Sequence, residues 1–258
     1  MKGPENGPPV FLPHGWPDAP RGWGAIAAAL HAKGLHTIAP YLRGSGPTRF
    51  LSSETPRVGA GVALAQGPEL LIRSQCSFRN ESQISQPWLL RFNRVDSAKF
   101  PGSIRPDASG INGSLCVDGG MAKVQNDPLG FARTQWDTWS PGGWFDEAEF
   151  SQTAKSFLNP DWVAIASNAY PSRWRDGEAW DSRYDPLQRR LGDVGTISTP
   201  TLMIQGMSDF CDAPSESEGL EAHFTARYQR VLLDGVGHFP HREAPVDVTA
   251  AILRHLGI

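Results

Sequence analysis

Three side chains with acid–base potential follow short apolar runs in the sequence. His14 and His238 each come shortly after such a run, in a turn rich in glycine or proline. Asp209 follows a third apolar run, residues 199–206. A histidine whose ring is oriented by a carboxylate can activate water or another nucleophile. If the runs are parallel strands, their carboxyl ends meet at one edge of a sheet, and the three residues lie close together.

The elements around His14 predict a strand–helix–strand unit. Residues 10–13 are apolar, a helical pattern runs from about residue 21 to 33, and Gly34 ends it where helices favour glycine. Residues 36–40 then form a second short buried strand. This order of elements implies a parallel sheet with a right-handed crossover.

The C-terminal part of the chain repeats this pattern. Residues 199–206 are continuously apolar, as in a strand buried on both faces, and a helical segment is expected near residues 216–224. A second strand is predicted at 230–233, and an amphipathic helix over 246–256 closes the chain. Both ends therefore predict an α/β fold.

Two central regions differ from these ends. Residues 126–190 are rich in Trp and Phe and have a helical texture, which indicates a helical insertion over the edge of the sheet. The 9 tryptophans of the chain suit a closed apolar pocket, but ordinary core packing is the preferred explanation for most of them individually. Residues 67–114 show little periodicity, and their nearest approach to a central strand is 88–92.

Length and charge exclude several classes of partner. A chain of 258 residues builds one domain, and its net charge of -3 is interleaved, so we expect neither nucleic acid nor a membrane as partner. The expected partner is a small neutral molecule, and the oligomeric state is left open. Residues 1–9 lack a targeting pattern, no apolar run is long enough to cross a bilayer, and three cysteines are too few for a disulfide framework. These features predict a soluble cytoplasmic protein.

Three segments carry a family resemblance. They are residues 11–48, which contain His-Gly-Trp-Pro, then 204–214, IQGMSDFCDAP, and 235–245, GVGHFPHREAP. In this order they resemble the oxyanion, acid and histidine loops of α/β-hydrolases, in particular the epoxide hydrolase and haloalkane dehalogenase branch. The resemblance covers roughly residues 10–66 and 115–258.

The resemblance implies an α/β-hydrolase fold, in which a mostly parallel sheet is flanked by helices and carries an inserted helical cap. It divides the chain into an N-terminal part of the core at 1–114, a cap at 115–192 and a C-terminal part of the core at 193–258. Residues 67–114 are atypical for the family and are a candidate for disorder. No metal and no organic cofactor are implied.

The resemblance also assigns roles. His238 would be the base that activates water, and Asp209 would orient it. The backbone N–H of Trp16 would bind developing negative charge, while His14 and Pro17 shape the oxyanion loop. The Trp16–Pro17 bond is a candidate cis peptide.

Two of these roles have competitors in neighbouring positions. His241 competes with His238, although its place in the loop before the last helix favours a surface role. Asp212 competes with Asp209, although it could instead cap the helix expected near residue 216.

The substrate-binding residue and the nucleophile also have alternatives. Tyr170 is a candidate substrate-binding residue of the cap and Tyr184 a weaker one, but a half-buried structural tyrosine explains either equally well. The family's nucleophile stands in a Gly-x-Asp-x-Gly or Gly-x-Ser-x-Gly turn, and the chain contains neither. Asp96 and Asp118 are weak candidates, so the nucleophile stays unassigned. One hypothesis is that residues 67–114 are translated in the wrong frame or mark a deletion.

The family's two strands before the oxyanion strand have no counterpart in residues 1–9. The resemblance predicts a hydrolase, similar to epoxide hydrolases, that acts on a small apolar substrate with water. The missing nucleophile turn favours a rival prediction. In that rival, the chain is a catalytically inactive relative, either a ligand-binding protein or a damaged gene product.

Overall fold

The strands and helices come from five stretches of the chain. The computed structural model describes residues 3–66, 88–89, 118–169, 180–192 and 195–258. The strands of these stretches are β1 (Pro9–Phe11), β2 (His36–Ile38), β3 (Trp88–Leu89), β4 (Thr201–Gly206) and β5 (Tyr228–Leu233). Every pair that they form is parallel.

The strands form two hydrogen-bonded groups among the described residues. In the first group β1 is central, with Val10 opposite Thr37 of β2 and opposite Trp88 of β3. In the second group β4 and β5 pair along their length, beginning with Thr201 opposite Tyr228. Parallel pairing confirms the α/β class. The single sheet expected from the sequence is divided, in this part of the chain, into these two groups.

Strand β3 lies in the region where the sequence pattern predicts no convincing strand. It consists of two residues within the 88–92 segment, and it pairs with β1 on the side away from β2. Because β3 is parallel to β1, its carboxyl end points toward the same edge as the loop that contains His14 and Trp16. The rest of residues 67–114 lies outside the described residues, as does Asp96.

Two helices cover the strands of the core. A 3-10 turn, η1 (Pro20–Trp23), leads into α1 (Gly24–Ala32), and Gly34 follows it with a left-handed φ of 80°. The last helix, α11 (Pro245–Leu256), ends in the same way at Gly257. Helices and strands share one apolar core, whose larger buried members are Val10, Leu12, Trp23, Ile26, Leu30, Leu35, Ile204, Val248 and Ile252.

The segment between the two halves of the core is helical. Its elements are α4 (Asp118–Asn126), α5 (Pro128–Thr138), α6 (Glu147–Ala154), η4 (Lys155–Leu158), α7 (Trp162–Ala169), η5 (Ser182–Tyr184) and α9 (Asp185–Gly192). Asp127 and Asp146 cap α5 and α6, since each carboxylate accepts a hydrogen bond from the N–H three residues on. We call α4 to α7, residues 118–169, the helical segment.

Aromatic side chains form the interior of the helical segment. Trp136 contacts Trp144, Phe145 and Phe150, at ring-centroid distances between 4.7 and 5.3 Å. Trp162 stacks with Trp16 of the core at 5.8 Å. Most of the described tryptophans therefore pack in a second apolar core, as ordinary core packing predicts.

Two expectations about the C-terminal half need correction. No α-helix forms at 216–224; the chain makes two 3-10 turns instead, η6 (Pro214–Ser217) and η7 (Leu220–His223). Glu218 is extended and Gly219 has a left-handed φ of 71°, which interrupts any continuous helix. Strand β5 begins two residues before the expected Arg230. A short helix, α10 (Pro240–Glu243), lies between β5 and α11.

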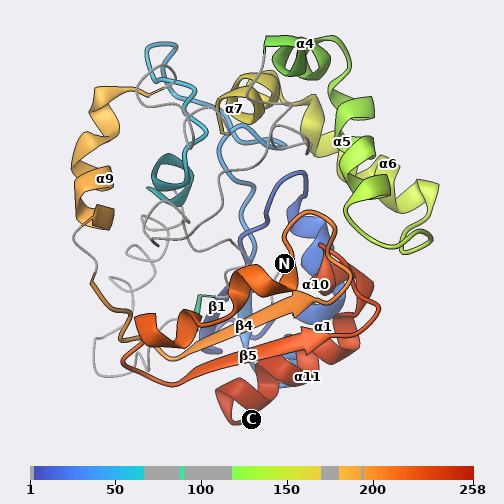
Figure 1. Cartoon of the computed structure of the whole chain (residues 1–258), viewed down its shortest axis with the longest axis vertical. Coiled ribbons are helices and arrows are strands. Elements are labelled where there is room, and N and C mark those ends of the chain that lie inside the picture. Colours follow the sequence, from blue (N-terminus) through green and yellow to red (C-terminus); the bar gives the residue numbers. More distant parts are fainter. Residues whose placement is uncertain (1–2, 67–87, 90–117, 170–179, 193–194) are drawn as a thin grey trace.

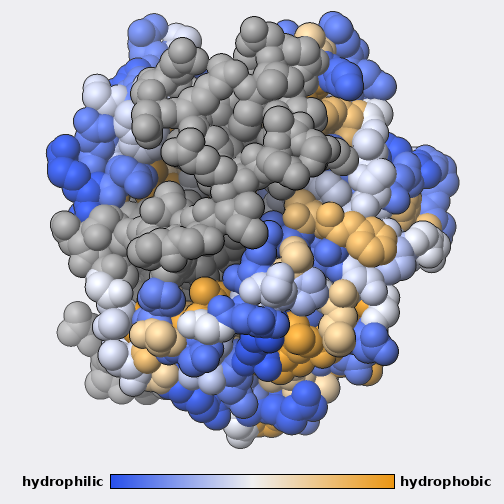
Figure 2. Space-filling model, in the orientation of Figure 1, coloured by the Kyte–Doolittle hydropathy of each residue, from blue (hydrophilic) through white to orange (hydrophobic). Residues whose placement is uncertain are grey.

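The helical segment and the core of strands, α1 and α11 form two layers that lie in different parts of the molecule. Figure 1 shows β4, β5, α1 and α11 in the lower half of the molecule and α4 to α7 in the upper half, with α5 and α6 at the right. Hydrophilic residues cover much of the described surface in Figure 2, with hydrophobic residues in smaller groups between them. Among the described residues, no helix combines the length and the apolar character needed to span a bilayer.

Candidate active site

Asp209 and His238 meet beyond the carboxyl ends of two paired strands. Asp209 follows β4, His238 follows β5, and these strands are parallel neighbours. The His238 Nδ1 atom lies 3.0 and 3.1 Å from the two carboxylate oxygens of Asp209. The Asp209 side chain is 7% exposed and the His238 side chain 21% exposed. The histidine is therefore oriented by a buried carboxylate while its ring stays partly accessible.

Backbone contacts fix the loop that carries Asp209. The Asp209 Oδ1 atom accepts hydrogen bonds from the backbone N–H groups of Cys211 and Asp212, both at 2.9 Å. The N–H of Ser208 also donates to the Val236 carbonyl at 2.9 Å, which ties this loop to the histidine loop. The two loops are thus held together by main-chain atoms as well as by the Asp209–His238 contact.

Asp212 does not cap the following turn. Ala213 is the N-cap residue of η6, and no side chain makes a capping hydrogen bond there. The Asp212 carbonyl instead accepts a hydrogen bond from Gln205 at 2.8 Å. Of the two competing carboxylates, the structure brings Asp209 into contact with the His238 ring.

The pKa of His238 is raised above its ordinary value of 6.5. Burial alone lowers the pKa, because it disfavours the charged ring, but the hydrogen bond and the charge of Asp209 outweigh this effect. The more distant carboxylates of Asp212 and Glu243 act in the same direction as Asp209. The raised pKa means that the His238 ring binds its proton more firmly than a free imidazole does.

His14 is held as a neutral ring in the loop that follows β1, which we call the oxyanion loop only because it resembles that loop of the family. Its Nδ1 lies 2.7 Å from the Gly15 carbonyl, and the Leu42 N–H donates to its Nε2 at 3.1 Å. One nitrogen must therefore carry the proton and the other must accept, and burial lowers the pKa of His14. The Trp16–Pro17 peptide is cis, as the sequence indicated. Both nitrogens of His14 serve the shape of the loop.

A chain of rings connects the oxyanion loop with the histidine loop. The Trp16 ring lies 6.1 Å from that of Trp139, and the Trp139 ring meets the His238 ring edge-on at 4.8 Å. Residues that are more than 220 positions apart in the sequence are thus separated by a single indole ring. The two ends of the chain meet at one edge of the core, as the sequence predicted.

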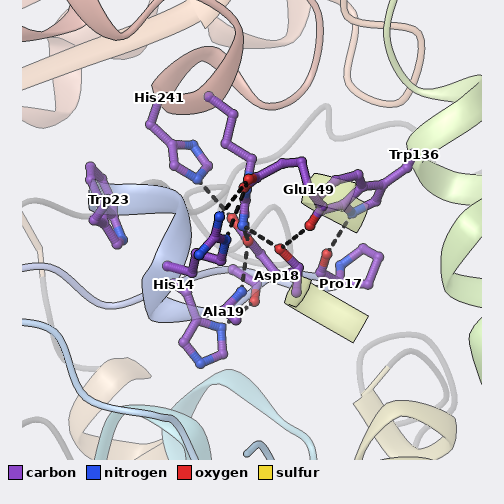
Figure 3. A network of polar contacts seen from close by, with 12 residues as sticks. His14, Pro17, Asp18, Ala19, Trp23, Trp136, Glu149 and His241 are labelled. Atoms are coloured by element: carbon purple, nitrogen blue, oxygen red, sulfur yellow. Dashed lines mark hydrogen bonds and ion pairs between the residues drawn. The ribbon is translucent and has the colours of Figure 1, made fainter. Parts of the chain in front are cut away.

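A buried polar network lies beside this edge, and His241 belongs to it (Figure 3). The His241 Nε2 atom lies 2.7 Å from Asp18 Oδ2, and Arg242 donates to Asp18 Oδ1 at 2.5 Å through Nη2 and at 3.0 Å through Nε. The surface role expected for His241 is wrong, because its side chain is only 7% exposed and packs on the Trp23 ring.

The same network reaches the helical segment. Arg242 also contacts Glu149 of α6, and its guanidinium lies 4.8 Å from the ring centroid of Trp136. The Trp136 indole N–H donates to the Pro17 carbonyl at 2.9 Å. Although burial raises the pKa of the Asp18 carboxyl, the charge of Arg242 and the His241 hydrogen bond outweigh it and hold that pKa far below its usual range.

The tyrosine candidates have different outcomes. Tyr170 lies outside the described residues. Tyr184 is buried, and its hydroxyl accepts a hydrogen bond from Arg43 at 2.5 Å, as expected for a structural tyrosine. Asp118 is the first residue of α4, and the described residues provide no strand-to-helix turn around it.

Three residues at this edge could hold a metal ion. Cys211, Asp212 and His238 present potential ligand atoms within 4.8 Å of one another, and each residue is partly exposed. Sulfur, nitrogen and oxygen donors of this kind suit Zn²⁺. A metal ion there would occupy a nitrogen of the His238 ring.

The comparisons with known proteins agree with this geometry. A crystal structure from Klebsiella pneumoniae subsp. pneumoniae MGH 78578, named as a candidate epoxide hydrolase, is 28% identical to this chain. The match covers 100% of this chain and 92% of the Klebsiella chain, with a TM-score of 0.83. Epoxide Hydrolase A from Mycobacterium thermoresistibile is 18% identical, with a TM-score of 0.69 over 99% of this chain and 92% of that one. The chain therefore has the α/β-hydrolase fold.

The structural neighbours include epoxide hydrolases and a haloalkane dehalogenase. A loop variant of a haloalkane dehalogenase from Bradyrhizobium elkanii is 15% identical, with a TM-score of 0.68 over 99% of this chain and 91% of that one. Epoxide hydrolase A of Mycobacterium tuberculosis (strain ATCC 25618 / H37Rv) is 33% identical over 82 residues, which span 31% of this chain and 26% of that protein. No family model matches the chain. The chain therefore resembles the epoxide hydrolase branch.

Proposed function

We propose that this protein is a hydrolase of the epoxide-hydrolase-like branch that acts on a small apolar substrate with water. The observation that carries the proposal is the contact of His238 Nδ1 with both carboxylate oxygens of Asp209, at 3.0 and 3.1 Å. This contact leaves Nε2 as the ring nitrogen that accepts a proton from water. Asp209 holds the ring in the required orientation and stabilises the imidazolium that forms.

Trp16 and the helical segment complete the proposed site. The backbone N–H of Trp16 would bind negative charge that develops on the substrate, from a loop shaped by His14 and the cis Trp16–Pro17 peptide. We propose that residues 115–192 form a cap over a core made of 1–114 and 193–258. The contacts of Trp16 with Trp162 and Trp139 support this division, because they join the oxyanion loop to the helical segment. Aromatic walls of this kind suit an apolar substrate, and Tyr170 remains a candidate to bind its oxygen.

The nucleophile remains unassigned. By analogy with the family it would follow the strand next to the oxyanion strand, which is the place of β3 beside β1. Residues 90–117, which follow Leu89 directly, lie outside the described part of the chain.

A second candidate function follows from the sequence in that region. Because the chain lacks both forms of the nucleophile turn, it could bind an apolar ligand without turning it over. The encoding DNA offers a direct check on the hypothesis of a frame error. A Gly-x-Asp-x-Gly turn after an apolar strand in another frame supports it, and the lack of such a turn in both other frames contradicts it.

One assay separates the two functions. Aryl epoxides and p-nitrophenyl esters are offered to the wild-type protein and to His238→Ala. We expect hydrolysis by the wild type and a loss of about 10²-fold or more in the variant, because general base catalysis contributes that much. Binding without turnover contradicts the proposed hydrolase activity. Turnover that survives in His238→Ala contradicts the assignment of His238 as the base.

A further inference from the structure

The end of helix α5 reaches both loops of the acid–base pair. Trp139 is the C-cap residue of α5, Ser140 follows it, and both are buried. They belong to the helical segment, whereas Asp209 and His238 follow strands of the core. Two adjacent residues of one layer therefore contact the functional loops of the other.

Ser140 binds the histidine loop through its hydroxyl. The backbone N–H of His238 donates to Ser140 Oγ at 2.9 Å, and that hydroxyl in turn donates to Glu243 Oε1 at 2.8 Å. The Glu243 carboxylate also accepts from the N–H groups of Gly237, at 2.6 Å, and Phe239, at 2.8 Å. Ser140 and Glu243 together thus occupy three consecutive backbone N–H groups centred on His238.

Trp139 binds the acid loop and the histidine ring. Its carbonyl accepts a hydrogen bond from the backbone N–H of Phe210, the residue after Asp209, at 3.1 Å. Its indole ring meets the His238 ring edge-on at 4.8 Å, which limits how that imidazole can turn. The contacts of Trp139 and Ser140 therefore lie on both sides of the Asp209–His238 hydrogen bond.

The close approach of the two layers requires a glycine. A Cβ atom at Gly237 would overlap the Ser140 side chain and backbone. The Gly-x-Gly-His turn of the sequence thus has a packing reason as well as a conformational one, because it lets Ser140 reach the His238 N–H.

We infer that Trp139 and Ser140 are positioning residues that hold Asp209 and His238 in hydrogen-bonding register across the boundary between the helical segment and the core. This inference rests on the proposed function for its effect on catalysis, but its effect on the geometry of His238 is independent of turnover. Displacement of a reacting group by about 1 Å can cost about 10²-fold in rate.

The test compares Ser140→Ala with Ser151→Ala. Ser151 is exposed on α6, so Ser151→Ala removes the same hydroxyl group at a position away from Asp209 and His238. In Ser140→Ala we expect faster hydrogen exchange at Gly237, His238 and Phe239, by about tenfold, with α11 unchanged. We also expect the pKa of His238, followed by NMR, to fall toward its ordinary value because the contact with Asp209 loosens. Ser151→Ala should change neither quantity.

Turnover gives an additional readout. We expect kcat to fall by about 10- to 100-fold in Ser140→Ala with little change in KM, and Ser140→Thr, which keeps the hydroxyl, to recover part of the loss. A uniform rise in exchange across β5 and α11 with an unchanged His238 pKa shows a merely structural role and overturns the inference. If the wild type has no turnover, the proposed function fails, while the exchange and the His238 titration still decide the positioning role.

Discussion

Two pairs of ionisable side chains lie near the oxyanion loop, and they differ in burial. Asp18 with Arg242 is almost completely enclosed, with side chains 2% and 5% exposed, whereas the ring of His238 is 21% exposed beside Asp209. The pKa of the Asp18 carboxyl is lowered, and the pKa of the His238 ring is raised. The enclosed pair has no access to a substrate and joins three segments of the chain. The partly open pair leaves the His238 ring accessible, as the proposed base requires.

The contribution of the enclosed pair to stability is tested by removing the charge of Asp18. We expect Asp18→Asn to lower the free energy of unfolding by about 3 kcal/mol, the lower end for a broken buried ion pair, because Arg242 keeps its contact with Glu149. Denaturation in urea measures the change. Asp137→Asn is the matched control, since Asp137 pairs with Arg133 on the surface and should cost about 0.5 kcal/mol or less. Equal losses in the two variants would contradict the structural role of Asp18.

The opposite pKa shifts of the two pairs are tested by measuring stability as a function of pH. The lowered pKa of Asp18 gives stability that is present above its ordinary value of 3.8 and is lost as the pH falls below it. The raised pKa of His238 gives stability that is present below 6.5 and is lost as the pH rises through the folded-state value. Urea midpoints between about pH 3 and 9 should therefore show an acid limb that flattens in Asp18→Asn. A smaller loss of stability as the pH rises through the neutral range should disappear in His238→Ala. If the pH dependence of the urea midpoint is the same in the wild type and in both variants, these assignments are wrong.

The edge that carries Asp209 and His238 could be predicted because its signals are local. Each residue follows an apolar strand within a few positions, and parallel strands place their following loops at one edge. The Gly-rich turn before His238 and the Trp16–Pro17 sequence are also local features. The catalytic roles come from the family resemblance and remain predictions.

The contacts between the layers could not be predicted in the same way. Asp18 meets Arg242 across 224 positions, and Ser140 meets His238 across 98. No local sequence pattern predicts such a distant partner. His241 was expected at the surface from its place in a loop, but Asp18 and Trp23 enclose it. A long-range partner decided the burial of this side chain.

The most direct test of the central claim is an NMR titration of the His238 ring in the wild type and in Asp209→Asn. Contact with the Asp209 carboxylate predicts a pKa above 6.5 in the wild type and a lower pKa in the variant, because burial is then opposed only by the smaller effects of Asp212 and Glu243. Asp212→Asn is the control, and it should shift the pKa less, since its carboxylate is the more distant charge. An equal His238 pKa in the wild type and Asp209→Asn would contradict the pair on which the proposed chemistry depends.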